Sequence, residues 1–300
     1  MRFSGTPRSD LVWKRPPVAK LDLSGRKTAV IGGTGGIGQA LALRMATLGA
    51  EVVVVGRNFR DAGAPRISFV SADLSLMAEA RRVGRALPAI LDAVVLTTGI
   101  MAAPKREETA EGLERDLAVS YLSRLAILRE LAPRLGERTP LGKRPRVFIM
   151  GMPGTDPKPR LGDLNAENGY SAMAVHLNTV AGNEALVLDS AQRYPQVDFY
   201  GLNPGLIKTS IRGNMMGDGS WKHRSTEWLI GKLTMSAEQY AERIVPLLFA
   251  PELEGHSGAM FNQKGIAIHA SRSLTSDAVT RLIAGGEALV RRALREEPAS

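Results

Sequence analysis

The sequence lacks several residue types and patterns on which common classes of protein depend. It contains no cysteine in 300 residues, which excludes disulfides and suits an intracellular protein. Its four histidines are not paired at the spacing of metal ligands, so we expect no metal site. No Gly-x-Ser-x-Gly pattern occurs, which argues against a serine nucleophile on a strand-to-helix elbow.

The chain also has no long apolar run. None approaches the ~20 residues that span a bilayer, so we expect no membrane span. Residues 1–24 form a basic arm that carries prolines but lacks the apolar centre of a secretory signal. We therefore expect a cytoplasmic protein; a mitochondrial targeting segment is the alternative, which Asp10 and the pair Pro16-Pro17 disfavour.

The charge balance is basic, with a formal net charge of +9. The basic residues are spread along the chain without a nucleic-acid-binding motif, so we expect no nucleic-acid partner and attribute the excess to solubility and attraction of an anionic cofactor. With 44% hydrophobic and 23% charged residues, the composition is that of a soluble globular protein. The length fits one large α/β domain.

The clearest motif is a glycine-rich turn between a strand and a helix. Thr28 to Ile31 is a short apolar run that predicts a buried strand, and a helical pattern follows from Ala40. Glycines in such a turn let the backbone approach a pyrophosphate, and the new helix offers free N–H groups and a partial positive charge. We therefore predict a dinucleotide site that includes Gly32, Thr34, Gly35, Gly36, Ile37 and Gly38.

The second strand, Glu51 to Val55, ends in Gly56-Arg57-Asn58. A chain that selects NAD usually places a carboxylate here, whereas Arg57 offers a permanently charged fork suited to a 2′-phosphate. We therefore predict NADP, with NADPH preferred over NADH, and assign Arg57 and Asn58 to the cofactor. The alternative is that Arg57 is an ordinary surface arginine at a strand end.

Two further strands, Ile67 to Ser71 and Ala93 to Leu96, end in polar or small residues. Ligands bind outside the carboxyl ends of parallel strands, so we place Asp73 and Leu74 near an adenine and Thr98 and Gly99 near a ribose. Asp73 or Ser75 could equally cap the helix that starts there.

In its landmarks the chain resembles the short-chain dehydrogenase/reductase superfamily, and within it the retinol-dehydrogenase-like branch, over roughly residues 24 to 270. The resemblance implies a Rossmann fold, a doubly wound parallel sheet, and reversible hydride transfer between a carbonyl or alcohol and NAD(P). It also implies that Pro204, Gly205 and Thr209 line the nicotinamide pocket. Besides the glycine turn and Asp73-Leu74, the matching residues are Asp163-Leu164-Asn165, Tyr170-Ser171-Ala172-Met173, Asn183 and Asn203-Pro204-Gly205-Leu206-Ile207-Lys208-Thr209.

The catalytic set implied by the resemblance is an asparagine, a serine, a tyrosine and a lysine four residues after the tyrosine, and here it is degenerate. The asparagine position, on a helix expected from Leu113 to Leu135, matches Ser120. The serine position, after a strand from Val147 to Met150, falls on Met152 or Gly151. Alignment on the flanking landmarks puts the tyrosine position at His176 and the lysine position at Val180. A second register takes Tyr170 as the tyrosine and leaves Ala174 in place of the lysine.

The chemistry favours His176 as the proton-transfer group. An unassisted tyrosine titrates near ~10, so keeping it ionised at neutral pH costs about 4 kcal/mol without a nearby cation. A histidine can donate or accept a proton near neutrality without a lysine. The plain alternative is a histidine packed on a helix face with one nitrogen bound to a backbone carbonyl.

The remainder of the chain is expected to cover and close the domain. We predict a Rossmann-type domain over residues 25–274 with a substrate-covering lid at about 211–250, including a helix from Ala237 to Phe249. Gly258 to Gln263 is a candidate last strand and residues 275–300 hold a C-terminal helix. Met215, Met216, Trp221 and Trp228 suggest an apolar small-molecule substrate, or they pin the lid onto the domain. The resemblance suggests a homo-oligomer packed through the helices around Leu113 to Leu135 and Tyr170 to Ala191.

Three functions are compatible with a cofactor motif that is intact and a catalytic set that is degenerate. The first is an NADP(H)-dependent oxidoreductase with His176 or Tyr170 as a non-standard proton-transfer residue. The second is a catalytically inactive cofactor-binding protein that acts through a partner, and the third is a non-redox isomerase or cyclase on the same fold.

Overall fold

The computed structural model describes residues 5–17, 21–136, 139, 142–205 and 235–295. Strands and helices alternate through the first two thirds of the chain, as the sequence predicts. The elements are β1 Lys27–Ile31, α1 Gly36–Thr47, β2 Glu51–Gly56, β3 Ile67–Ser71, α2 Met77–Ala86, β4 Ala93–Leu96, α3 Arg115–Leu117, the π-helix η2 Ala118–Leu122, α4 Ser123–Leu131, the 3₁₀ helix η3 Ala132–Arg134, β5 Arg146–Met150, α5 Ala172–Arg193, β6 Asp198–Leu202, α7 Ala237–Leu248, the 3₁₀ helix η5 Pro251–Leu253, β7 Met260–Phe261, β8 Ala267–Ile268 and α8 Ser276–Ala293.

The strands form one sheet of eight in the order β3-β2-β1-β4-β5-β6-β7-β8. All neighbours run parallel except β7 and β8, which are antiparallel. The chain moves outward from β1 to β3 and then returns to place β4 on the other side of β1. This reversal creates the crevice between β1 and β4 where doubly wound sheets bind ligands, and it confirms the predicted fold class.

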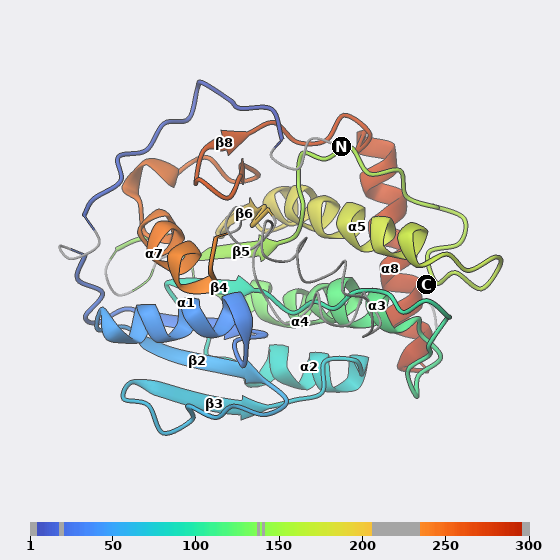
Figure 1. The fold of residues 1–300 in the computed structure, drawn as a ribbon, viewed down its shortest axis with the longest axis horizontal. Coiled ribbons are helices and arrows are strands. Elements are labelled where there is room, and N and C mark those ends of the chain that lie inside the picture. The colour runs from blue at the N-terminus through green and yellow to red at the C-terminus, as the bar shows by residue number, and fades with distance from the viewer. Residues whose placement is uncertain (1–4, 18–20, 137–138, 140–141, 206–234, 296–300) are drawn as a thin grey trace, which may run out of the picture.

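Helices cover both faces of the sheet because the buried strands are apolar on both sides. One face packs against α2, α4, α5 and α8, and alternate strand residues such as Ile31, Leu96 and Ile149 belong to this cluster. The other face packs against α1 and α7, and it receives the intervening residues, among them Val30 and Phe148. Figure 1 shows the sheet between these two helical layers.

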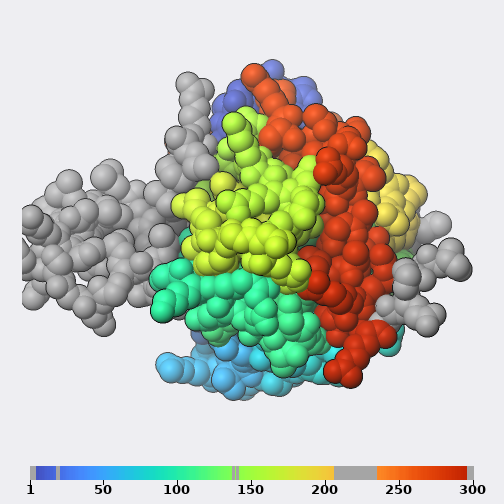
Figure 2. All heavy atoms as spheres, turned by 90° about the vertical axis from the view of Figure 1, so that its right-hand side faces the viewer, coloured from blue at the N-terminus to red at the C-terminus, as the bar shows by residue number. Residues whose placement is uncertain are grey.

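The C-terminal helix α8 packs against α5, η2 and α4. Figure 1 shows it crossing α5, and Figure 2 shows it in red on the surface of that side of the molecule. Its contacts are intimate: the hydroxyl of buried Tyr121 donates to the Leu282 carbonyl over 3.1 Å, and Arg129 pairs with Glu287 at 2.7 Å. Every residue of α4 from Ser123 to Leu128 is buried. The oligomer expected through these helices stays a prediction, and a second copy would have to displace α8 to reach the middle of α4.

The segments expected as an arm and a lid partly belong to the folded body. Within residues 5–17, Pro7 bridges to Ile268 beside β8, and the Trp13 indole donates to the Gly265 carbonyl. Helix α7 packs on α1 with buried Tyr240 and Ile244, so this part of the predicted lid lies in a helical layer of the core. The rest of the predicted lid, 211–234, lies outside the described residues. The helices of the described part of the chain are all too short or too polar to cross a bilayer.

Candidate active site

The turn between β1 and α1 has the close packing that its glycines allow. Gly32 adopts a left-handed φ of 86°, where an L side chain would be strained. A Cβ on Gly38 would lie 2.3 Å from the Gly32 carbonyl oxygen and 2.4 Å from the Thr97 hydroxyl. The start of α1 can therefore approach the carboxyl ends of β1 and β4 only because these positions lack side chains.

The N-terminus of α1 is open to an anion. Gly35 caps the helix in extended conformation without a side-chain hydrogen bond, and the first turn holds no acidic residue. A Cβ on Gly35 would meet no atom of the described residues within 4 Å, so these residues leave the space beside it free. Free N–H groups, the helix dipole and open space fit a pyrophosphate. Ile37, in the same turn, is partly buried against the core.

The residues predicted to face the adenosine lie at the carboxyl ends of β2 and β3. Thr34 folds over the end of β2, where a Cβ on Gly56 would lie 2.6 Å from its methyl group. Arg57 and Asn58 follow on the surface. Burial acts to raise the pKa of Asp73, but the hydrogen bonds from Ser75 and the positive charge of Arg57 lower it overall. Leu74 is buried in the core beneath this edge.

A different residue performs the capping that the sequence suggested for Asp73 or Ser75. Helix α2 begins after Leu76 without a side-chain cap of its own. The carboxylate of Glu111 accepts from the backbone N–H groups of Met77, at 2.6 Å, and Ala78, at 3.2 Å. The Asp73 carboxylate accepts from the Ser75 N–H within its own turn.

The residues predicted to face the ribose and the nicotinamide lie after β4 and β6. Thr98 and Gly99 follow β4, and the Thr98 hydroxyl is buried without a hydrogen-bond partner in the described part of the chain. Pro204 and Gly205 follow β6 and are partly buried, with Gly205 in left-handed conformation at φ 66°. Thr209, also predicted here, lies outside the described residues. The predicted residues that are described thus gather at the carboxyl edge of one sheet.

The candidate catalytic residues meet at the seam between α3, η2 and α4 on one side and α5 on the other. His176 Nδ1 lies 3.2 Å from Oδ2 of Asp116, whose side chain is wholly buried. The Ser120 hydroxyl donates to the other carboxylate oxygen of Asp116 at 2.5 Å and accepts from the Ile100 N–H at 3.0 Å. The hydroxyl of Ser120 is therefore engaged in fixing Asp116 and the loop after β4.

Tyr170 is placed differently. Its hydroxyl donates to the carbonyl oxygen of Ala103 at 2.5 Å, in the loop after β4. Burial, together with the carboxylates of Glu114 and Asp116, raises the pKa of Tyr170. A phenol that donates to a carbonyl and resists ionisation is poorly suited to act as a base.

A buried cation, Arg124, lies at this edge and was not among the predicted site residues. Arg124 of α4 is 3% exposed, and its guanidinium donates to the carbonyls of Thr98 and Met150 and, over 2.8 Å, to the Asn183 side chain. Burial lowers the pKa of Arg124 to about 9, against the opposing effect of Asp116. The arginine is therefore charged at neutral pH.

A spacing signal could have revealed both missed residues. Asp116, Ser120 and Arg124 recur every four residues and so share one helix face, which would be a costly place for charges unless they faced a polar partner. On α5, His176 and Asn183 provide that partner. Val180, at the lysine position, is buried, and Met152, at the serine position, is partly buried just beyond β5.

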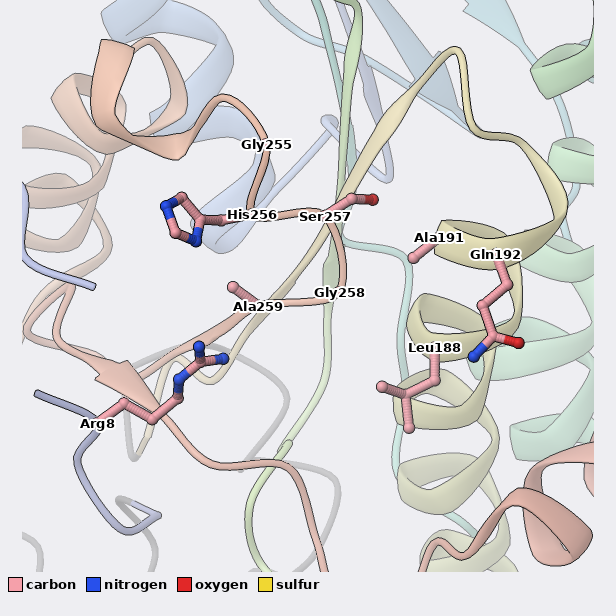
Figure 3. Close-up of a pocket in the computed structure, with 9 residues that line it drawn as sticks. All are labelled: Arg8, Leu188, Ala191, Gln192, Gly255, His256, Ser257, Gly258 and Ala259. Carbon is pink, nitrogen blue, oxygen red and sulfur yellow. The ribbon is translucent and has the colours of Figure 1, made fainter. Parts of the chain in front are cut away.

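A second hollow lies far from this edge and is a weaker candidate site. The hollow in Figure 3, about 390 Å³, lies at the amino-terminal edge of β6 and β7, with Leu188 and Gln192 of α5 facing the loop 255–259. Arg8 on its rim is already paired with Asp10. No group of three or more acidic or histidine side chains that could hold a metal ion occurs in the described ranges.

The chain is similar in sequence to known oxidoreductases. No family model matches the chain. It is 46% identical to an uncharacterized oxidoreductase of Saccharomyces cerevisiae, over 95% of this chain and 94% of that protein. It is 30% identical to the polyprenol dehydrogenase of Mus musculus, over 81% of this chain and 77% of that protein.

Solved structures share the fold. A putative uncharacterized protein from Mycobacterium paratuberculosis covers 95% of this chain, and 100% of its own, with a TM-score of 0.68 at 19% identity. A 3-oxoacyl (acyl-carrier-protein) reductase from Agrobacterium tumefaciens with NADP bound covers 82% of this chain, and 96% of its own, with a TM-score of 0.59 at 18% identity. A short chain dehydrogenase from Salmonella enterica gives the same TM-score, 0.59, at 18% identity over 82% of this chain and 98% of its own. With the glycine turn, the strand order and these relatives in agreement, the chain belongs to the short-chain dehydrogenase/reductase superfamily of oxidoreductases.

Proposed function

We propose that the protein is an NADP(H)-dependent oxidoreductase of the carbonyl or alcohol group of an apolar small molecule, with His176 as its proton-transfer residue. The observation that carries the proposal is the contact between His176 Nδ1 and the buried carboxylate of Asp116, next to the carboxyl ends of β4 and β5. A histidine oriented by a buried carboxylate is a common arrangement for proton transfer.

The cofactor edge supports NADP. The open N-terminus of α1 would hold the pyrophosphate, and exposed Arg57 would pair with a 2′-phosphate that a carboxylate there would repel. Among solved structures of the same fold, the reductase from Agrobacterium tumefaciens carries NADP. When bound, NADPH would supply a hydride to the carbonyl carbon of the substrate.

The chain's own residues would manage the proton. Asp116 accepts from Nδ1–H of His176, which leaves Nε2 as the nitrogen that has no partner among the described residues. Nε2–H of His176 would donate its proton to the carbonyl oxygen during reduction and recover it during oxidation. Ser120 would act indirectly, through Asp116, because its hydroxyl donates to the second carboxylate oxygen of Asp116.

The tetrad of the superfamily is thus replaced, with a cost in rate. The serine position offers Met152 or Gly151, neither of which can donate a side-chain hydroxyl to the substrate oxygen. Loss of one such donor commonly costs about 3 kcal/mol of barrier stabilisation. We therefore expect a slow enzyme.

An apolar side chain beside the histidine supports an apolar substrate. Met173 lies one turn before His176 on α5, and 59% of its side chain is exposed. Ala102, Leu161 and Tyr170 pack nearby as partly buried apolar residues. One relative is named a polyprenol dehydrogenase, and a polyprenol is a large apolar alcohol; another, 27% identical, is named a putative daunorubicin C-13 ketoreductase.

The test combines binding with turnover. Fluorescence titration should show NADPH binding more tightly than NADH, and a panel of apolar ketones, aldehydes and quinones should yield a substrate that oxidises NADPH. His176→Gln should lower kcat by about 100-fold or more while NADPH binding persists. His256→Gln, at the remote hollow, is the matched control and should leave kcat unchanged.

Other outcomes contradict the proposal in distinct ways. Cofactor binding without turnover of any substrate favours the inactive cofactor-binding protein. Conversion of a substrate without a change in NADPH absorbance favours an isomerase or cyclase. Equal affinity for NADPH and NADH removes the assignment of Arg57.

A further inference from the structure

Burying the charged side chain of Arg124 costs free energy, so its position in the core requires an explanation. Its side chain leaves α4 and ends between the carboxyl ends of β4 and β5, and its Nε has no hydrogen-bond partner within the described residues. Burying a charged group with one donor unsatisfied costs free energy that an apolar residue at the same position would avoid. A purely structural role is therefore a weak explanation.

The guanidinium of Arg124 binds the backbone at the ends of β4 and β5, below the edge predicted to bind the cofactor. One terminal nitrogen, Nη2, donates to the Thr98 carbonyl after β4, and the other, Nη1, donates to the Met150 carbonyl that ends β5. Gly99 lies directly over it, since a Cβ at Gly99 would be 3.8 Å from Nη2. The charge therefore lies one layer below the surface predicted to face the ribose and nicotinamide.

Among the described residues, no carboxylate pairs directly with this cation. Its side-chain partner is the neutral amide of Asn183, at 2.8 Å, and Asp116 acts on it through space. The carboxylate of Asp116 is itself engaged by Ser120 and His176. In a buried site, where charges interact more strongly than in water, Arg124 leaves a positive field at the edge.

We propose that Arg124 is a positioning residue that fixes the ends of β4 and β5 and biases the bound cofactor toward its reduced form. The inference rests on the proposed function. A fixed positive charge under the nicotinamide would disfavour the cationic ring of NADP⁺ relative to the neutral ring of NADPH, and it would stabilise negative charge on the substrate oxygen. NADPH would then be bound more tightly than NADP⁺, and the oxidised cofactor would be released more readily.

The test is the ratio of the Kd of NADP⁺ to the Kd of NADPH, measured by titration at one pH and salt concentration. Wild type should favour NADPH, and Arg124→Met should reduce the ratio by about five-fold or more, since it removes the charge. Arg124→Lys keeps the charge and should retain the ratio within about two-fold. If Arg124→Met does not fold, Arg124→Gln, which keeps one donor for the carbonyls, provides the same comparison.

Arg129→Met is the matched control. It removes an arginine from the same helix that pairs with Asp189 and Glu287 on the outer side, so it should lower Tm without changing the ratio. An unchanged ratio in a folded, uncharged variant of Arg124 would overturn the inference and leave the proposed function intact. Failure of wild type to bind either nucleotide would overturn both, and a loss of the ratio in Arg124→Lys equal to that in Arg124→Met would show that charge is not the cause.

Discussion

The glycine turn at the start of α1 and the seam between α4 and α5 serve the same edge of the sheet through different physical means. In the turn, contacts depend on the absence of side chains: Gly38 packs on the Gly32 carbonyl and the Thr97 hydroxyl. In the seam, function depends on a network of polar side chains: Asp116 fixes His176, and Arg124 holds Thr98 and Met150. On the proposed function, the first region would recognise a shape, and the second would set charges and move protons.

The difference explains which region can change. A backbone cradle for phosphate tolerates almost no added atoms, because it must bring main chain to within contact distance of the ligand. A proton-transfer network can be rebuilt with different side chains as long as one group can exchange a proton and is held in place. We infer that this chain kept the first region and replaced the second.

The largest expected effect comes from adding one methyl group to the turn. Gly38→Ala would drive a Cβ into the Gly32 oxygen at 2.3 Å, so we expect a loss of about 2 kcal/mol in unfolding free energy, a drop in Tm of about 5 °C, and no measurable NADPH binding. Gly35→Ala is the control for thermal stability alone, because its Cβ meets nothing within 4 Å in the described part of the chain. Equal thermal stability of the two variants would show that the turn is not packed as described.

The next effect tests the seam. Asp116→Asn keeps the shape of the side chain but removes the acceptor charge that orients His176, so kcat should fall by about 10- to 100-fold with NADPH binding retained. Asp189→Asn, which breaks an ion pair between α5 and Arg129 of α4, should lower stability slightly and leave kcat unchanged. Steady-state kinetics and thermal unfolding distinguish the two roles, and equal kcat in wild type and Asp116→Asn would remove the orienting role.

Arg57→Gln returns to the cofactor side. Losing a charge-assisted contact with the 2′-phosphate should weaken NADPH by about ten-fold or more and leave NADH within two-fold. Arg66→Gln is a fair control because Arg66 is also an exposed arginine beside the same strands, at the amino end of β3. If both substitutions act alike in fluorescence titration, general electrostatic attraction rather than a specific contact explains the affinity.

The smallest effect belongs to Tyr170→Phe. The substitution removes the bond to the Ala103 carbonyl, so we expect about 1 kcal/mol of lost stability. The raised pKa of Tyr170 keeps its phenol protonated through neutral and mildly alkaline pH, so its removal should leave kcat within about three-fold and the shape of the pH–rate profile unchanged. Loss of the alkaline limb in the variant would instead identify Tyr170 as the titrating group.

Local patterns allowed much of the fold to be predicted. Strands β3 and β4 were predicted with their observed bounds, because short apolar runs between turns identify buried parallel strands. The expected last strand at Gly258 to Gln263 is only the two residues of β7, followed by antiparallel β8. The continuous helix expected from Leu113 to Leu135 is interrupted by the π-helix η2, a feature common at functional sites that periodicity does not reveal.

The positions of the candidate site residues could be predicted only where the backbone itself determines them, and their roles stay predictions. The residues of the glycine turn lie at the predicted edge because spacing along one strand, turn and helix determines them. Asp116 and Arg124 were missed because their partners are distant in the sequence. His176 lies 60 residues from Asp116, and Asn183 and Met150 lie 59 and 26 residues from Arg124. Only the packing of the helices and of β5 brings them together. No local pattern fixes that packing.

A crystal structure with NADP and an apolar ketone or alcohol bound would test the central claim most directly. We predict that Nε2 of His176 lies within about 3.2 Å of the substrate oxygen, on the nicotinamide side, with Tyr170 still bound to Ala103. A tyrosine hydroxyl or a lysine ammonium at that oxygen, with His176 turned away, would contradict the claim that proton transfer has moved to the histidine.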